Sequence, residues 1–397
     1  MAILSVNAGS SSLKFSLHRF QDHDVDSAWV SGCLQGLEPG GTPSLDWSMD
    51  GQSHQETLRV DNGDGFASAL QRLRDWLHDV PGMPRLRAVA HRVVHGGSTY
   101  SQATRVTPEV MAQLARLNSL APLHQPHNLA GIRAMAQAFP DLPQIACFDT
   151  AFHVDVPAMH QRFGLPRTLH EQGVRRYGFH GLSYQYILQS LQRHSPRAHQ
   201  RLLLAHLGNG ASLCAVKAGR SHATTMGFSA LDGLMMGTRS GALDPGVLLY
   251  LLEQGWDHAR LERLLYKESG LLGVSGLSAD VRRLRQSDDP HAQEALALFT
   301  HRVVREAGAM TACLQGLDVL AFSGGIGEHD AVLRANVCEA LGWMGIQLDA
   351  ERNRLAVGNA IAPVHAPDSS IDVWVIPTDE GRVAAQQALA WLESHNA

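Results

Sequence analysis

Two glycine-rich turns, each between two apolar strand-like runs, lie 200 residues apart (positions 12 and 212) in this chain. The first lies within Leu4-Ser-Val-Asn-Ala-Gly-Ser-Ser-Ser-Leu-Lys-Phe15, and the second within Leu204-Ala-His-Leu-Gly-Asn-Gly-Ala-Ser-Leu-Cys-Ala215. A turn of Gly, Ala and Ser between two strands predicts a hairpin whose backbone N–H groups are uncrowded, so phosphate oxygens can approach them. Two copies predict a duplicated domain that grips a phosphate chain from both sides of a cleft, which favours phosphoryl transfer.

Composition narrows the class of protein. Hydrophobic residues make up 44% and charged residues 18% of the 397 positions, which is typical of a globular protein and long enough for two domains. The net charge of −5 argues against a nucleic-acid partner, so an anionic substrate has to be captured by locally placed arginines. The five cysteines form no C-x-x-C pair, which is typical of a reducing cytoplasm. No apolar run approaches the ~20 residues that span a bilayer, and the start Met-Ala-Ile-Leu predicts a strand and not a signal peptide.

The two halves of the chain repeat one order of elements. Each shows three meander strands, then helices, then a buried strand that ends in Gly-Gly, at 96–97 and at 324–325. We therefore expect an α/β protein with two domains, residues 1–150 plus 382–397 and residues 151–381, the C-terminal helix returning to the first domain. In the first half we expect three strands within 2–37, a loop with weak strands over 38–63, a helix over 66–77, a strand over 86–94, helices over 108–118 and 127–138, and a strand over 144–149. In the second half we expect strands over 201–207, 212–217 and 220–225, helices within 245–267 and 290–315, a strand over 318–322, a helix from about Glu328, a strand over 373–376 and a helix over 379–393.

Glycine-rich segments supply the candidate phosphate contacts. The turn over 7–14 offers Asn7, three serines (Ser10, Ser11 and Ser12) and Lys14, although an ordinary serine-rich hairpin would look the same. In the second turn Gly208 and Gly210 leave the backbone open, and neither turn has the Walker spacing. A third segment, Ser323-Gly-Gly-Ile-Gly-Glu-His329, follows a buried strand and opens a helix, which is typical of an anion or nucleotide seat. A Rossmann site is excluded because that fingerprint must open a βαβ unit.

Two arginines are candidate anion clamps. Arg92 follows a buried strand, and Arg239 lies in Gly237-Thr-Arg-Ser-Gly241, where the flanking glycines suggest a flexible loop that presents the guanidinium. The fork of an arginine matches a carboxylate or a phosphoryl group, although a single arginine is more often a plain surface residue.

Histidines and acidic residues give two further sets of candidates. His124-x-x-His127, His91-x3-His95 and His153 suggest a zinc site, but they lack a linking glutamate and a cysteine, so we do not expect zinc. His180, between an aromatic residue and glycine in Tyr177-Gly-Phe-His-Gly181, could point a donor into a cleft or be a structural histidine. Asp149 and Glu380 end buried strands and suit Mg²⁺, or else cap the following helices.

These motifs together resemble the acetokinase family of acetate and propionate kinases, within the superfamily that also holds sugar kinases, heat-shock chaperones and actin. The matching segments run in order from end to end of the chain: Asn7-Ala-Gly-Ser-Ser-Ser-Leu-Lys-Phe, His91-Arg-Val-Val-His-Gly-Gly, Ala121-Pro-Leu-His-Gln-Pro-His-Asn, Phe148-Asp-Thr-Ala-Phe-His, Tyr177-Gly-Phe-His-Gly, His206-Leu-Gly-Asn-Gly-Ala-Ser, Met236-Gly-Thr-Arg-Ser-Gly, Phe322-Ser-Gly-Gly-Ile-Gly-Glu and Pro377-Thr-Asp-Glu.

The resemblance implies two duplicated actin-like (ribonuclease H-like) domains with mixed sheets flanked by helices and a cleft between them. It implies reversible in-line transfer of the ATP γ-phosphoryl group to acetate, with Mg²⁺ or alternatively Mn²⁺, in a cytoplasmic homodimer that has neither a nucleic-acid nor a membrane partner. Carried onto this sequence, the catalytic residues are Arg92, Asp149, His180 and Arg239. The metal ligands are Asn7 and Glu380, and the substrate pocket holds Arg92, Val94, Leu123, His124, Phe179 and Ala230. The nucleotide-binding residues are Lys14, His206, Leu207, Gly208, Asn209, Gly210, Asp280, Val281, Arg282, Gly324, Gly325, Ile326 and Gly327.

The chain departs from the family pattern at a few positions. Ala230 stands where proline is common on the wall of the acyl pocket, Gly381 follows Glu380 where glutamate is common, and Ala242 and His329 replace an acidic residue and an asparagine. A smaller side chain at Ala230 could admit a longer acyl chain. An apolar pocket discriminates between substrates that differ by one methylene by only ~1–3 kcal/mol. A propionate or butyrate kinase is therefore an alternative within the family. Outside it, the alternatives are a nucleotide-binding regulator and a zinc hydrolase.

Overall fold

The computed structural model describes residues 1–9, 11–38, 41–49, 51–58, 65–80, 82–358 and 360–395, with the backbone alone for 65–67. It divides into two compact units: unit 1 is Met1–Ala151 with Asp379–Ala397, and unit 2 is Phe152–Thr378. The expected boundary at 381/382 therefore needs correction, because Glu380 belongs to unit 1, where its helix packs on the sheet. Ser10, one of the expected turn residues, lies outside the described residues.

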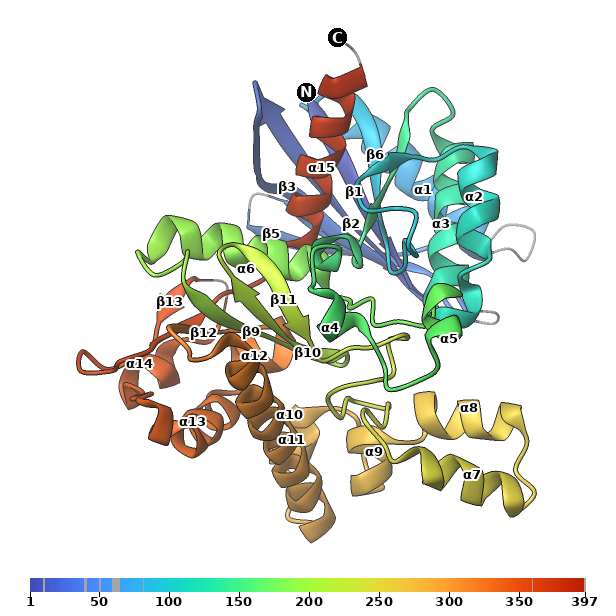
Figure 1. Cartoon of the computed structure of the whole chain (residues 1–397). Coiled ribbons are helices and arrows are strands. Elements are labelled where there is room, and N and C mark those ends of the chain that lie inside the picture. Colours follow the sequence, from blue (N-terminus) through green and yellow to red (C-terminus); the bar gives the residue numbers. More distant parts are fainter. Residues whose placement is uncertain are drawn as a thin grey trace. The chain divides into compact units, whose positions relative to one another are not determined.

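Unit 1 is a twisted sheet with helices on both faces (Figure 1). The strand order is β5-β4-β3-β2-β1-β6-β8-β7, with β1, β6 and β8 parallel. Alternate residues of β1 (Ala2, Leu4, Val6) join the core under α1, while Ser5 on the opposite face bonds the first turn of α15. The elements are β1 (Ala2–Ala8), β2 (Leu13–Gln21), β3 (Asp24–Gln35), β4 (Ser44–Met49), β5 (Gln52–Thr57), α1 (Gly65–Asp79), β6 (Leu86–Val93), β7 (Thr104–Arg105), α2 (Pro108–Ala115), η1 (Asn118–Leu120), α3 (Gln125–Ala138), β8 (Gln144–Phe148) and α15 (Glu380–His395).

Unit 2 repeats this plan with the order β11-β10-β9-β12-β14-β13, in which β9, β12 and β14 are parallel. The first elements of unit 2 are η2 (Ala151–His153), α4 (Ala158–Gln161), α5 (Arg167–Glu171), α6 (Gly181–His194), β9 (Arg201–Leu207) and β10 (Ala211–Lys217). The boundary between the units falls within η2, because Ala151 still belongs to unit 1. The rest are β11 (Arg220–Thr224), α7 (Pro245–Glu253), α8 (His258–Lys267), α9 (Gly270–Ser275), α10 (Val281–Arg285), α11 (Pro290–Leu314), β12 (Val319–Ser323), α12 (Gly324–His329), α13 (Ala331–Ala340), η3 (Gly342–Met344), α14 (Ala350–Leu355), β13 (Ala362–Pro363) and β14 (Asp372–Val375).

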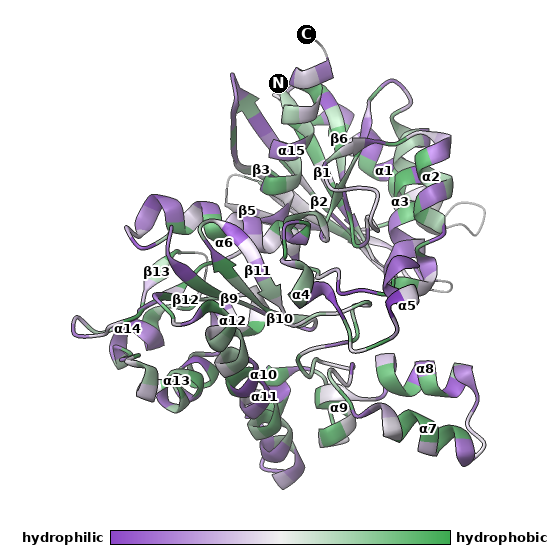
Figure 2. Cartoon of the chain, viewed as in Figure 1, coloured by the Kyte–Doolittle hydropathy of each residue, from purple (hydrophilic) through white to green (hydrophobic). Residues whose placement is uncertain are grey.

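The two sheets confirm the expected α/β fold with a duplicated core. β3-β2-β1-β6-β8-β7 of unit 1 has the same order and sense as β11-β10-β9-β12-β14-β13 of unit 2. The two units also share a covering helix. Helix α15 follows β14 of unit 2 in the chain and packs on β1 of unit 1, and α6 follows β8 of unit 1 and packs on β9 of unit 2. The central strands are the most apolar parts of both units (Figure 2). No described helix has the length and apolar content to cross a membrane.

The structure refines two expectations about the elements and contradicts a third. The segment over 38–63 contains two regular strands, β4 and β5, which extend the sheet beyond β3. The helical stretch over 245–267 is two helices, because Gly255 (φ 84°) ends α7 before Asp257 caps α8. The helix expected from Glu328 begins at Gly324.

Candidate active site

The first cluster of predicted residues lies in unit 1. Arg92 on β6 binds Asp149 with two hydrogen bonds, Nη2 to Oδ2 at 2.7 Å and Nε to Oδ1 at 3.1 Å. The same Nε lies 3.1 Å from Oε2 of Glu380, the first residue of α15. The Asp149 side chain is 1% exposed, whereas that of Glu380 is 19% exposed. Asp149 therefore orients the guanidinium, and Glu380 is the more accessible carboxylate.

Strand register explains why these residues meet. β1 and β6 are parallel, and Asn7 comes level with Arg92 one step beyond their last pair. On β8, Cys147 pairs with Arg92, so Asp149 two residues further lies on the same face. Amide and carboxylate oxygens from Asn7, Asp149 and Glu380 are hard ligands of the kind Mg²⁺ prefers. The chemistry of this donor set therefore suits a magnesium ion.

Arg92 carries a fixed positive charge at this place. Burial by itself would lower the pKa of Arg92, but the charges of Asp149 and Glu380 outweigh it and raise the pKa above its ordinary value. Its Nη1 forms no hydrogen bond or ion pair with another described residue. The guanidinium is thus oriented by Asp149 and lies beside the Glu380 carboxylate.

The second cluster lies in unit 2 around His180. This residue precedes α6 in the left-handed conformation (φ 58°), which is costly for a non-glycine residue and recurs at functional sites. Its Nδ1 is 2.8 Å from Ser212 Oγ, which in turn is 2.5 Å from Tyr184 Oη. The ring stacks on His206, with centroids 4.2 Å apart, and His206 Nδ1 is 2.8 Å from Ser183 Oγ. Both imidazoles are therefore held in one orientation.

Glycines form an open cradle in front of His180. A Cβ placed on Gly210 would lie 3.2 Å from His180 Nε2 and 3.9 Å from Arg239 Nη2. A Cβ on Gly208 would lie 3.8 Å from the backbone nitrogen of Gly325, and a Cβ on Gly325 would meet nothing within 4 Å. The structure thus brings the predicted phosphate turn, the predicted histidine and the predicted arginine together, at distances that a side chain on Gly210 would crowd. Such a cradle fits phosphate oxygens.

Arg239 is not presented by a flexible loop, as its flanking glycines suggested. The residue is 8% exposed, and its Nη1 donates to the carbonyl oxygen of Ala230 at 2.8 Å. Gly237 donates its N–H to the carbonyl oxygen of Asn209 at 3.0 Å, and a Cβ there would collide with the Asn209 side chain. Gly241 (φ 69°) passes close to the carbonyl of Leu234. The glycines therefore allow tight packing of the loop, which fixes the guanidinium.

The segment over 323–328 is held by side chains on both sides. Glu328 Oε1 accepts hydrogen bonds from the N–H of Gly324 (2.8 Å) and the N–H of Thr378 (3.2 Å). Arg334, which is fully buried, donates from Nη1 to the carbonyl oxygens of Gly327 and Glu328, each at 2.9 Å. These contacts explain why α12 begins among glycines, which have low helix propensity.

The other predicted nucleotide residues have mixed environments. Asp280 caps α10 and pairs with the exposed Arg282 (2.7 Å between Oδ2 and Nη2), so both the capping and the ion-pair roles are present. Val281 and Leu207 are buried in the core, and Ile326 is half-buried. The side chains of Val281 and Leu207 pack in the core, so these two residues can contact a nucleotide only through their backbone atoms.

The predicted acyl-pocket residues belong to both units. Val94, Leu123 and His124 are part of unit 1, and Phe179 and Ala230 are part of unit 2. Val94, Phe179 and Ala230 are buried, while Leu123 and His124 are half-buried.

Lys14 pairs with Asn7 in the antiparallel ladder of β1 and β2, so it lies on the same face of the sheet as Asn7, on the strand next to β1. It is an exposed residue of β2 that lines an open groove of about 430 Å³ on the outer strands β2 to β5, together with Cys33, Asp46 and Trp47. All five cysteines of the chain are free thiols.

The histidines considered for zinc are dispersed. His91 in unit 1 binds the side-chain oxygen of Gln144 through Nε2 at 2.7 Å, whereas His153 belongs to unit 2. His153 donates from Nε2 to the carbonyl oxygen of Phe179 at 2.9 Å, which supports the backbone next to His180. Among the described residues, no three His, Cys, Asp or Glu side chains form a group able to hold a metal ion.

Buried histidines make the folded state sensitive to acid. Burial lowers the pKa of His91 and of His153 from 6.5 to about 4. Between these values the unfolded chain binds protons that the folded chain does not, so stability is full above pH 6.5 and falls as the pH drops toward 4. We expect each histidine to contribute a loss of roughly 3 kcal/mol across this window. Denaturant midpoints measured from pH 7 to 4.5 test this.

The matched variants are His91→Gln and His258→Gln. Glutamine cannot be protonated, so the midpoint of His91→Gln is expected to fall less with pH than that of the wild type. His258 is 93% exposed and its replacement should leave the pH dependence unchanged. Equal slopes for the wild type and His91→Gln would contradict the assignment.

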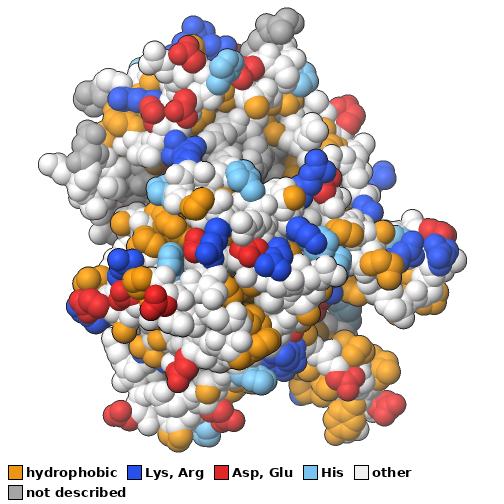
Figure 3. Space-filling model, turned by 60° about the vertical axis from the view of Figure 1, so that its left-hand side comes forward, with side chains coloured by type: hydrophobic (Ala, Val, Ile, Leu, Met, Phe, Trp, Pro, Cys, Tyr) orange, Lys and Arg blue, Asp and Glu red, His pale blue; other side chains and the backbone are white. Residues whose placement is uncertain are grey.

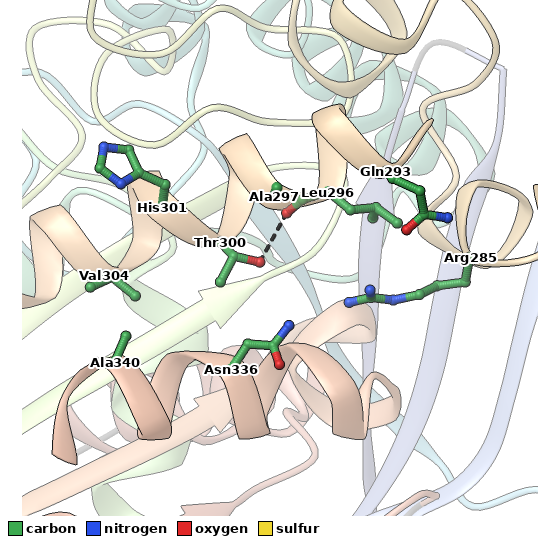
Figure 4. Close-up of a pocket in the computed structure, with 9 residues that line it drawn as sticks. All are labelled: Arg285, Gln293, Leu296, Ala297, Thr300, His301, Val304, Asn336 and Ala340. Atoms are coloured by element: carbon green, nitrogen blue, oxygen red, sulfur yellow. Dashed lines mark hydrogen bonds between the residues drawn. The ribbon is translucent and has the colours of Figure 1, made fainter. Parts of the chain in front are cut away.

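A separate groove of unit 2, about 390 Å³ in volume, runs between α11 and α13 (Figure 4). Its lining includes Arg285 and Asn336, and Arg285 is paired with Asp330 (3.0 Å between Nη2 and Oδ2). None of the residues predicted for the site lines this groove.

Four functional contacts were missed by the sequence-based reasoning. Ser212 and Tyr184 orient His180, Ser183 orients His206, and His153 holds the carbonyl of Phe179. Ser212 belongs to the repeated Gly-Ala-Ser turn, so its position in the motif was the available signal. Ser183 and Tyr184 lie on α6, and no sequence signal pointed to them because that helix was not predicted.

Comparison with known proteins places the whole chain in one family. The sequence profile of the acetokinase family matches residues 2–386. The chain is 50% identical over 389 residues to the acetate kinase of Rhodopseudomonas palustris, covering 97% of this chain and 96% of that one. The crystal structure of Porphyromonas gingivalis acetate kinase is similar with a TM-score of 0.86, 35% identity and 98% and 99% coverage. That of a propionate kinase from Francisella tularensis has a TM-score of 0.88, 33% identity and 97% and 98% coverage. With a family match over nearly its whole length and such relatives, this chain belongs to the acetokinase family.

Proposed function

We propose that this chain is an acetate kinase that transfers the γ-phosphoryl group of ATP to a carboxylate oxygen of acetate, reversibly and in line. The observation that supports it most is the cradle of unit 2, where Gly210 faces His180 Nε2 and Arg239 Nη2. Two donors beside an open phosphate turn suit the equatorial oxygens of a transferring phosphoryl group. Acetate is already an anion at neutral pH, so the reaction needs alignment and charge neutralisation more than a strong base.

The cluster of unit 1 supplies the remaining groups. We propose that Arg92, oriented by Asp149, binds the acetate carboxylate, and that Glu380 and Asn7 hold the metal, Mg²⁺ or alternatively Mn²⁺. The metal would neutralise charge on the phosphates when bound. Val94, Leu123, His124, Phe179 and Ala230 are the proposed acyl pocket. Asp280, Val281, Arg282 and the segment over 324–327 are the proposed adenosine seat, with Lys14, His206, Leu207, Gly208, Asn209 and Gly210 toward the phosphates.

Trapping of acyl phosphate with hydroxylamine tests the reaction. With MgATP and acetate we expect acetyl hydroxamate, and no product with acetate alone. The same assay gives kcat/KM for acetate, propionate and butyrate. Because Ala230 leaves a smaller wall and one methylene is worth ~1–3 kcal/mol, we expect propionate to be accepted within about tenfold of acetate. A propionate preference above tenfold would favour a propionate kinase, and no hydroxamate with any acid would favour a nucleotide-binding regulator.

We also propose that the chain works as a cytoplasmic homodimer on small-molecule substrates. Helix α7 and Leu243, two residues before it, expose large apolar side chains, which favours coverage by a second copy: Leu243, Val247, Leu249, Tyr250 and Leu252. On the face in Figure 3, acidic and basic side chains are interspersed among the described residues, which is unlike a nucleic-acid-binding surface. The free thiols and the use of ATP fit a reducing compartment.

A further inference from the structure

We propose that Ser5, Ser16 and His18 are positioning residues that set the place of Glu380 by holding its neighbour Gly381 against the sheet. This inference rests on the proposed role of Glu380 in the kinase reaction. All of these residues belong to unit 1.

The first contact ties the start of α15 to β1. Ser5 Oγ donates to the carbonyl oxygen of Gly381 at 2.6 Å, and Ser5 is 3% exposed. Ser5 pairs with Ser16 in the antiparallel ladder of β1 and β2, so both side chains lie on the face that α15 covers. The first turn of the helix is thereby held at one fixed place over the hairpin.

The second contact depends on the absence of a side chain at position 381. A Cβ on Gly381 would collide with Ser16 Oγ and would lie 3.2 Å from His18 Nε2. This close approach gives a physical reason for glycine at a position where the sequence departs from the family pattern.

His18 keeps the Ser16 hydroxyl in place beneath the helix. Its Nδ1 faces the carbonyl oxygen of Asp26 at 3.1 Å and therefore carries the proton, so Nε2 accepts from Ser16 Oγ at 2.8 Å. His18 is fully buried, and burial lowers its pKa, with Asp379 acting in the opposite direction. The neutral ring of His18 thus fixes the Ser16 hydroxyl on the side of the sheet that faces Gly381.

Further bonds fix the helix start laterally. Asp379 Oδ1 accepts the N–H of Arg382 at 2.9 Å, and Arg382 Nε donates to the carbonyl oxygen of Val25 at 2.8 Å. With its backbone held on both sides, Glu380 reaches Arg92 at 3.1 Å. A displacement of the helix start by about 1 Å would move this carboxylate away from Arg92, and misplacement of that size can cost about 10²-fold in rate.

The test is a substitution with a designed rescue. We expect Gly381→Ala to lower kcat by roughly 10- to 100-fold, as for other residues that orient metal-binding groups, with the KM for ATP changed less than threefold. Removal of the colliding hydroxyl in Ser16→Ala/Gly381→Ala should return kcat to within about threefold of Ser16→Ala alone. Gly308→Ala is the matched control, because Gly308 is also helical and nothing lies within 4 Å of an added Cβ.

A purely structural effect predicts a different pattern. Alanine favours a helix over glycine, so a position without a clash would gain stability, as we expect for Gly308→Ala. In a Glu380→Ala background, Gly381→Ala should cause no further loss of kcat, since it acts through Glu380. Unchanged kcat in Gly381→Ala, failure of the rescue, or additive losses with Glu380→Ala would each overturn the proposal. Hydroxamate formation by the wild type in the same assay separates these failures from a failure of the proposed function.

Discussion

Replacement of Arg239 by alanine is expected to lower kcat by about 10²- to 10³-fold, the usual effect of removing one preorganised donor to a developing charge. Arg239 Nη2 faces Gly210 of the phosphate turn, while Nη1 is anchored on the carbonyl of Ala230. The proposed adenosine contacts lie on other segments, so the KM for ATP should change by only a few-fold. Arg239→Lys keeps the charge but loses the fork and should recover part of the rate. Steady-state kinetics with the hydroxamate assay measure both variants.

The control for this prediction is Arg201→Ala. Arg201 is also in unit 2 and pairs with Asp318, but its side chain is 36% exposed, so its loss should leave kcat unchanged. Thermal melting separates a catalytic loss from unfolding, because Arg239→Ala also leaves the Ala230 carbonyl without its donor. A rate near that of the wild type in folded Arg239→Ala would refute the assigned role.

Replacement of Arg92 by alanine is expected to affect both stability and rate. Asp149 is 1% exposed and would lose the guanidinium that binds both of its oxygens, and removing one partner of a buried pair costs roughly 3–5 kcal/mol. The loss of the proposed carboxylate clamp should lower kcat by a further independent factor of about 10²–10³. Denaturant midpoints and kcat measured on the same preparations test the two effects.

The double variant Arg92→Ala/Asp149→Asn separates these effects. Removing the buried negative charge should recover much of the lost stability, whereas kcat should stay low because the guanidinium is still missing. Arg72→Ala serves as the control within unit 1, since the Arg72–Glu56 pair is about one-third exposed and worth at most about 1 kcal/mol. Recovery of kcat in the double variant would show that Arg92 acts only by neutralising Asp149.

Much of the fold was predictable because its strands and turns depend on short local sequence patterns. Apolar runs broken by glycine-rich turns predicted the hairpins of β1–β2 and β9–β10, and the Gly-Gly stops marked β6 and β12 as equivalent strands. The strands β4 and β5 were expected only as weak strands within a loop, because their sequence, from Ser44 to Thr57, is largely polar and pairs at the edge of the sheet, where few side chains are buried. Helix α12 was missed at its start because its glycines depend on Glu328 and Arg334 for stabilisation.

The sequence by itself determined which chemical groups this protein holds: the glycine turns, Arg92, Arg239, His180 and the two carboxylates were all found as motifs, because each motif is short and local. The tertiary structure alone decided how they act. It placed Glu380 with Arg92 and Asp149 in unit 1, buried Arg239 in a packed loop, and set the hydroxyls of Ser212 and Ser16 behind His180 and Gly381. These contacts join residues far apart in the chain, and their geometry follows from strand register and helix packing, which no local pattern encodes.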